Sequence, residues 1–134
     1  MRFLVAALLM VAACRHDVGP GEGEGEGEGE GEGNGCPTDP VAGLIVPVID
    51  NATQSRICNA TVSTQDGAFQ ETLVLQGSTP ADCQYTGAVD RPGTYDIAVS
   101  APAHQPSTFS NLDVPADACG KPVPTTIQMS LDLQ

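Results

Sequence analysis

A strict alternation of glycine and glutamate runs from residue 21 to residue 33 and limits where this chain can fold. Glycine loses more backbone entropy on folding than any other residue, and the intervening glutamates repel one another and offer no apolar surface to bury. We expect residues 14–35 to form a disordered acidic tether, which leaves residues 36–134 as the folded part. The repeat favours a spacer over a weak collector of Ca²⁺ or Mg²⁺, because a coil does not fix carboxylates around one point.

The N-terminus ahead of this tether predicts an export signal. Arg2 is followed by an apolar run over residues 3–11, which is shorter than the ~20 residues that a bilayer-spanning helix needs. Residues 1–13 therefore predict a cleaved signal peptide rather than a membrane span. Residues 11–14, Val-Ala-Ala-Cys, resemble the lipobox of bacterial lipoproteins. That resemblance implies cleavage before Cys14 and a diacylglycerol thioether on its sulfur; the alternative is an ordinary secretory signal with a chance cysteine.

A lipid anchor on Cys14 predicts a location at the membrane of a bacterial cell envelope. Arg15 follows Cys14 at the place where Asp would resemble the inner-membrane retention signal of enteric lipoproteins, so the outer membrane is favoured. The formal net charge of −12 argues against nucleic acid as a partner, because phosphate binding needs clusters of Lys and Arg.

Alternation of apolar and polar residues at a period of two recurs throughout residues 36–134, and no stretch shows an apolar helical period. Pro47 inside the first alternating segment indicates an edge strand or a bulge. Asp-Gly at residues 66–67 predicts a tight hairpin turn, and Arg-Pro-Gly at residues 91–93 predicts a type II turn. The pattern predicts an all-β fold, a seven-stranded Greek-key β-sandwich. The predicted strands are residues 44–49, 59–65, 68–76, 83–88, 94–100, 108–114 and 126–133.

Two segments of this region resemble a known family. Residues 91–102, RPGTYDIAVSAP, resemble the hairpin motif PGxYxVxVxAPGY of carboxypeptidase regulatory-like domains, and residues 43–50, GLIVPVID, resemble that family's opening strand and the start of its Asp-rich turn. The resemblance implies a transthyretin-like, or prealbumin-like, sandwich that serves as a non-catalytic accessory or adhesive module. The chain departs from the pattern at Ala103-His104, where the family usually has Gly-Tyr, and at Gln54, where the turn usually has Gly.

Four cysteines remain beyond Cys14, and an even number in an exported domain predicts two disulfides. Three pairings are possible, and sequence alone does not choose among them. In immunoglobulin-like sandwiches the first and last strands often lie side by side and parallel, which would bring Cys36 near Cys119. Cys58 and Cys83 flank strands that return to one point, so we favour the pairs Cys36–Cys119 and Cys58–Cys83. The spacing argues against zinc, because there is no Cys-x-x-Cys pair.

No motif supplies a nucleophile, a base and a group that orients the base. His104 is the only histidine of residues 36–134, and its Pro-flanked position predicts a surface turn residue. The chain also lacks the Tyr-Arg-Gly-Ser ending of the transthyretin-like hydrolases of purine degradation. The two Asn-x-Thr sequons, at Asn51 and Asn59, are interpreted as chance matches. Four aspartates lack the spacing of an EF-hand loop and are expected to be solvated: Asp90, Asp96, Asp113 and Asp117.

These observations predict a non-enzymatic binding or adaptor module, without cofactor, that meets an unknown protein or glycan partner. A carbohydrate-binding module is the alternative. Glycan platforms usually expose Trp or Tyr, however, and this chain has no Trp and only Tyr85 and Tyr95, both expected in the core. An envelope hydrolase is the third hypothesis, and it would need His104 beside a nucleophile and a carboxylate.

Overall fold

The computed structural model describes residues 35–134, so the predicted signal peptide, Cys14 and the Gly-Glu repeat lie outside the described residues. The described chain is all-β, as predicted, and contains no helix. Accordingly, no helix within residues 35–134 has the length and apolar character needed to cross a membrane. The strands are β1 (Ala42–Val46), β2 (Val48–Asp50), β3 (Thr61–Asp66), β4 (Phe69–Thr72), β5 (Val74–Gln76), β6 (Gln84–Val89), β7 (Gly93–Ser100), β8 (Ser107–Val114), β9 (Thr125–Thr126) and β10 (Met129–Leu131).

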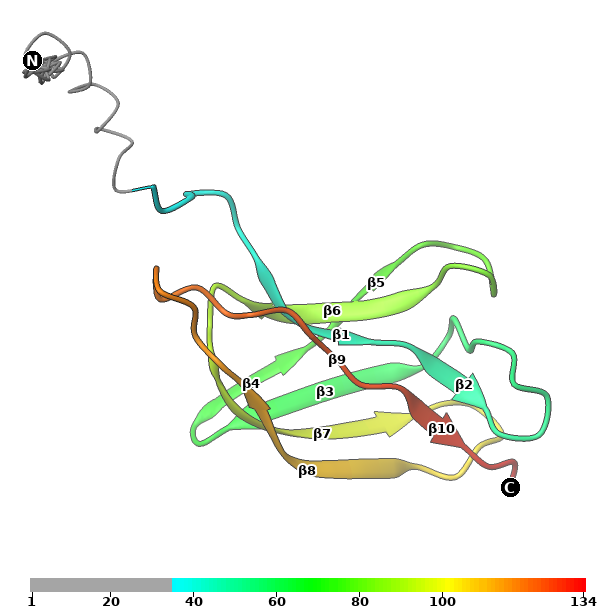
Figure 1. The fold of residues 1–134 in the computed structure, drawn as a ribbon. Helices are drawn as coiled ribbons and strands as arrows, with labels where there is room; N and C mark the ends of the chain where they lie inside the picture. Colours follow the sequence, from blue (N-terminus) through cyan, green and yellow to red (C-terminus); the bar gives the residue numbers. More distant parts are fainter. Residues whose placement is uncertain (1–34) are drawn as a thin grey trace, which may run out of the picture. The chain divides into compact units, whose positions relative to one another are not determined.

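The strands form two four-stranded layers and one two-stranded ladder. One layer has the order β5-β6-β1-β9 and the other has the order β4-β3-β7-β8 (Figure 1). The parallel ladder of β2 and β10 continues the register of β1 and β9: Leu44 lies opposite Thr125, and Val48 lies opposite Met129. The architecture is therefore β-sandwich-like, with the first strand segment lying beside the last.

The structure has ten strands rather than the seven predicted, because three of the predicted segments are each interrupted. Pro47 separates β1 from β2, since proline has no N–H to donate to a ladder. Leu73 separates β4 from β5, and the chain passes there from one layer to the other. Ile127 and Gln128 separate β9 from β10. Each of the seven predicted segments nevertheless contains strand, so the period-two pattern located the elements correctly.

Two predicted turns differ from the observed ones. The hairpin between β3 and β4 is shifted by one residue, because Asp66 pairs with Phe69 and the turn begins at Gly67, whose φ is 61°. The predicted type II turn before β7 is wrong, since Gly93 is not among the described residues with positive φ, whereas Asp90 is. A Cβ at Gly93 would meet the Asp66 carboxylate, which would have to shift.

The core lies between the two layers and contains both tyrosines, as predicted. Tyr95 is fully buried, and its hydroxyl donates to the Arg91 carbonyl at 2.7 Å. The Tyr85 hydroxyl accepts from the Ala60 N–H at 2.8 Å and donates to the Ile57 carbonyl at 3.2 Å. Buried phenol groups thus retain hydrogen-bond partners, which avoids the cost of leaving them unsatisfied. The rest of the buried core includes Leu44, Val46, Val48, Val62, Leu73, Ile97, Val99, Val114, Met129 and Leu131.

All four cysteines of the described chain are oxidised. Cys58 and Cys83 are joined with a Cα–Cα distance of 5.7 Å, and Cys36 and Cys119 form the second bond. The predicted pairing is confirmed. The reasoning behind it also holds in part, because the first and last strand segments do lie side by side and parallel.

Within residues 35–134 five non-glycine residues adopt left-handed backbone conformations, and two of them stand where the resembled family usually has glycine: Gln54, with φ 62°, and Ala103, with φ 64°. A left-handed conformation costs an L-residue roughly 1–2 kcal/mol, whereas glycine costs a folded chain about 0.5–1 kcal/mol of extra entropy. Ala103→Gly should therefore stabilise the protein by a fraction of a kcal/mol, measured as a higher thermal midpoint.

Ala98→Gly provides the matched control. Ala98 is an exposed residue in the extended part of β7, so the same change there should lower stability by about 0.5–1 kcal/mol. Equal destabilisation by both changes would contradict the strain assigned to Ala103.

Candidate functional site

The outer face of the β4-β3-β7-β8 layer carries a hollow of about 540 Å³. Hydroxyl and amide side chains dominate its lining, in keeping with the strand alternation that turns apolar residues inward. Five of these side chains make no hydrogen bond within the described part of the chain: Ser63, Gln70, Thr72, Thr108 and Ser110. Their donors and acceptors are available to a ligand.

Asp96 is the acidic side chain that β7 contributes to this hollow. Its Oδ1 accepts the N–H of Asn111 at 2.9 Å, at the point where β8 carries a bulge. Asn111 has a φ of 62°, and such bulges re-aim the side chains around them. This hydrogen bond to the backbone of β8 holds the Asp96 carboxylate in place.

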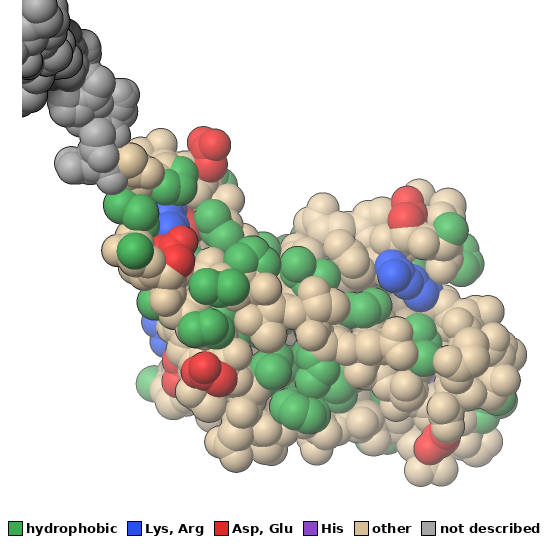
Figure 2. Space-filling view, viewed as in Figure 1, with side chains coloured by type: hydrophobic (Ala, Val, Ile, Leu, Met, Phe, Trp, Pro, Cys, Tyr) green, Lys and Arg blue, Asp and Glu red, His purple; other side chains and the backbone are tan. Residues whose placement is uncertain are grey.

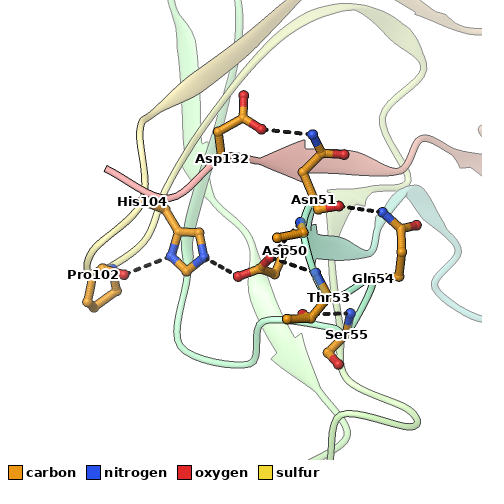
Figure 3. A network of polar contacts seen from close by, with 9 residues as sticks. Asp50, Asn51, Thr53, Gln54, Ser55, Pro102, His104 and Asp132 are labelled. Atoms are coloured by element: carbon orange, nitrogen blue, oxygen red, sulfur yellow. Dashed lines mark hydrogen bonds and ion pairs between the residues drawn. The ribbon is translucent and has the colours of Figure 1, made fainter.

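A second polar cluster lies at the end of β2 (Figure 3). The Asp50 Oδ1 accepts the N–H groups of Ala52 and Thr53 at 2.8 and 3.0 Å, so this side chain orders the turn that follows the strand. Its other oxygen, Oδ2, lies 2.9 Å from Nε2 of His104. The remaining ring nitrogen of His104, Nδ1, lies 2.8 Å from the Pro102 carbonyl.

Both ring nitrogens of His104 thus face oxygen acceptors. A neutral imidazole has one donor nitrogen, whereas the imidazolium has two, so the geometry favours the charged ring. The hydrogen bond with Asp50 raises the pKa of His104, and the Pro102 carbonyl adds to the effect. The same contact with His104, joined by the Thr53 N–H, lowers the pKa of the Asp50 carboxyl. Each residue therefore favours the charged form of the other.

The expectation that His104 is a surface turn residue is corrected by this arrangement. His104 does lie in a turn, but its side chain is only 12% exposed and that of Asp50 only 14%. The imidazole is turned inward because two acceptors face it there. A carboxylate is present beside His104, yet both ring nitrogens are engaged, so neither is placed to take a proton from a nucleophile.

The network also ties down the end of the described chain. The Asn51 side-chain amide donates to the Asp132 carboxylate at 2.8 Å, and the Asp132 carbonyl accepts the Gln105 N–H at 2.8 Å. The Gln134 N–H donates to the Ala103 carbonyl at 3.0 Å. Three segments distant in the sequence therefore meet around one ion pair.

The aspartates that were considered as metal ligands are dispersed. Asp90 binds Lys121 Nζ at 2.9 Å, and this contact lowers the pKa of Asp90. Asp117 accepts two backbone N–H groups of its own loop, from Cys119 and Lys121. Within residues 35–134 no group of three or more His, Cys, Asp or Glu side chains is placed to hold a metal ion. All four aspartates are exposed, as expected, and Asp90, Asp96 and Asp117 in addition accept backbone N–H groups.

Charged side chains are few over the face shown in Figure 2, where polar and apolar side chains predominate. Sequence reasoning missed both polar clusters described above. Strand alternation identified which side chains of β7 point outward, but the hollow depends on the pairing of four strands. The sequence places Asp50 only at the start of an Asp-rich turn, and its partner lies 54 residues away. The predicted lipidation residue, Cys14, lies outside the described residues.

No protein-family model matches the chain, and no curated protein matches it. The family resemblance therefore depends on residues 43–50 and 91–102 together with the left-handed residues described above.

His104→Gln should remove a pH-dependent part of the stability. Because the pKa of His104 is raised, its contribution is complete below the ordinary value of 6.5 and is lost as the pH rises through the folded-state value. Because the pKa of Asp50 is lowered, its contribution is complete above the ordinary value of 3.8 and is lost as the pH falls through the folded-state value. The difference in thermal midpoint between the native and variant chains should be largest between about pH 4 and 6.5.

Asp50→Asn is the companion variant, because an amide oxygen can still accept the two turn N–H groups but carries no charge. Asp50→Asn should lose stability over the same pH range as His104→Gln. Asp113→Asn on β8 should keep the native dependence of the thermal midpoint on pH. If His104→Gln leaves the dependence of the thermal midpoint on pH unchanged, the ion pair between Asp50 and His104 is contradicted.

Proposed function

We propose that this chain is a bacterial lipoprotein that displays a non-catalytic binding or adaptor module at the cell envelope. The short apolar run, the Val-Ala-Ala-Cys sequence ending at Cys14 and the acidic repeat support a lipid anchor followed by a spacer. In this proposal the acyl chains of Cys14 enter the outer membrane, and the Gly-Glu repeat keeps the sandwich clear of an anionic surface.

We assign the sandwich to the carboxypeptidase regulatory-like group with a transthyretin-like, Greek-key arrangement. Two layers of four strands support this assignment. Gln54 and Ala103 support it further, because the positions at which the family usually has glycine have left-handed conformations here. The backbone follows a glycine geometry even though the side chains differ.

The hollow on the outer face of β4-β3-β7-β8 carries the binding function. Hydroxyl and amide groups without partners inside a folded protein are suited to a ligand, because each can exchange a water for a ligand group. His104 supports binding over hydrolysis, since both ring nitrogens already face acceptors. Among ligand classes, a carbohydrate is the one that the hollow favours: burial of Tyr85 and Tyr95 removes an aromatic platform, while the polar side chains of the hollow offer another mode of recognition.

Envelope binding can be tested with an unlipidated form of the full chain. Cys14→Ser should abolish lipid attachment, so that cell fractionation finds the protein unprocessed or released from membranes. Purified Cys14→Ser protein should still sediment with isolated envelope fragments in a saturable way, because the sandwich supplies the contact. His104→Gln in the same background should sediment equally, since no catalytic step is involved.

Two results would oppose this proposal. Native processing and undiminished membrane retention of the Cys14→Ser chain would contradict the anchor. Failure of the soluble form to sediment with envelopes at any concentration would contradict the binding module.

A further inference from the structure

Strand pairing arranges the side chains of the hollow in two rows that cross the strands. The first row follows from the pairing of Ser63 with Thr72 and with Ala98, and of Ala98 with Thr108. This row contains only small side chains, so it forms the floor of the hollow. Neighbouring strands in the row are about 5 Å apart.

The second row lies two residues further along each strand. Gln65 pairs with Gln70 and with Asp96, and the bulged Ser110 lies beyond Asp96 on β8. Residues of the same face repeat every second position, so this row is about 7 Å from the first. Its longer side chains form one wall of a trough that runs across the strands.

The chemistry of the trough favours a neutral ligand rich in hydroxyl groups. Serine, threonine and glutamine both donate and accept hydrogen bonds, as sugar hydroxyls do. Glu71 does not add charge to the trough, because its Oε1 accepts the Ala88 N–H at 2.9 Å on the inner side. Asp96 is the carboxylate that remains.

The basic side chains that could bind an anionic ligand have partners outside the trough. The described residues include three basic side chains besides His104. Arg56 donates to the Cys83 carbonyl at 3.0 Å, and Lys121 binds Asp90 at 2.9 Å. Arg91 lies over the Phe69 ring at 4.0 Å. An acidic polysaccharide or a nucleic acid would therefore meet Asp96 without a compensating positive charge.

We propose that the trough formed by the rows Thr72-Ser63-Ala98-Thr108 and Gln70-Gln65-Asp96-Ser110 binds a neutral glycan chain laid across the strands. This inference rests on the proposed binding function and specifies its ligand class. An extended peptide fits less well, because peptides that join sheets bind backbone groups at an edge, whereas these groups project from a face. Recognition by hydrogen bonds without an aromatic ring makes each contact weak and suits repeated contacts along a polymer.

The test is an NMR titration of the ¹⁵N-labelled full chain carrying Cys14→Ser. The probes are the neutral hexasaccharides of cellulose, starch, xylan and chitin, with hexagalacturonate as the anionic comparison. At least one neutral probe should shift the amide signals of Ser63, Thr72, Ala98 and Thr108 in a saturable way. Hexagalacturonate should leave them in place.

Two lysine substitutions on β7 provide the matched pair. Both Ala98 and Thr94 are exposed on the same face, but only Ala98 lines the hollow. Ala98→Lys should weaken binding about tenfold or more, because a long side chain covers the floor of the trough, whereas Thr94→Lys should change it less than about twofold. Ser63→Ala, which removes one hydroxyl without added bulk, should weaken binding to an intermediate degree and guards against misfolding of the lysine variant.

Several outcomes would overturn the inference: no saturable shift with any neutral probe, equal binding of hexagalacturonate, shifts confined to β5 or to the Asp50–His104 cluster, or equal weakening by both lysine variants. If envelope sedimentation persists while every neutral probe fails, the glycan ligand is wrong and the binding module stands. If sedimentation fails as well, the proposed function is wrong with it.

Discussion

The parallel pairing of the first strand segment with the last is the interaction on which the rest of this structure depends. Leu44 pairs with Thr125 and Val48 with Met129, and the Asn51 N–H continues the contact to the Leu131 carbonyl at 2.8 Å. These contacts join the two ends of the domain, so no local turn stabilises them. The Asp50–His104 ion pair sits where this ladder ends, and it therefore forms only when both ends of the chain are in place.

One strand positions both the core and the candidate binding face. The inward residues of β7 include the fully buried Tyr95, while the outward residues include Asp96 and Ala98 in the hollow. Burial of the inner side chains fixes the backbone, and the backbone in turn fixes the spacing of the outer groups. A rigid sheet therefore presents hydrogen-bonding side chains without having to order a loop when a ligand binds, which reduces the entropic cost of association.

The sequence predicted the all-β architecture, because period-two alternation is a local signal that survives tertiary context. It also predicted the disulfide pairs Cys36–Cys119 and Cys58–Cys83 from an assumed strand adjacency. The strand count differed because Pro47, the crossing at Leu73 and the gap at Ile127–Gln128 each interrupt pairing within one predicted segment. The hollow could not be predicted, since its rows depend on the register between four strands. The environment of His104 was missed for a related reason: a Pro-flanked histidine indicates a turn, and nothing in the local sequence identifies Asp50 as its partner.

Two residues with left-handed conformations, Gln54 and Ala103, lie on either side of that ion pair. Gln54 is in the turn ordered by the Asp50 carboxylate, and Ala103 directly precedes His104. Strained backbone persists only where surrounding contacts fix it. Here the Gln54 amide donates to the Asn51 carbonyl at 2.9 Å, and the Ala103 carbonyl accepts the Gln134 N–H. The polar network therefore holds both turns in their left-handed conformations.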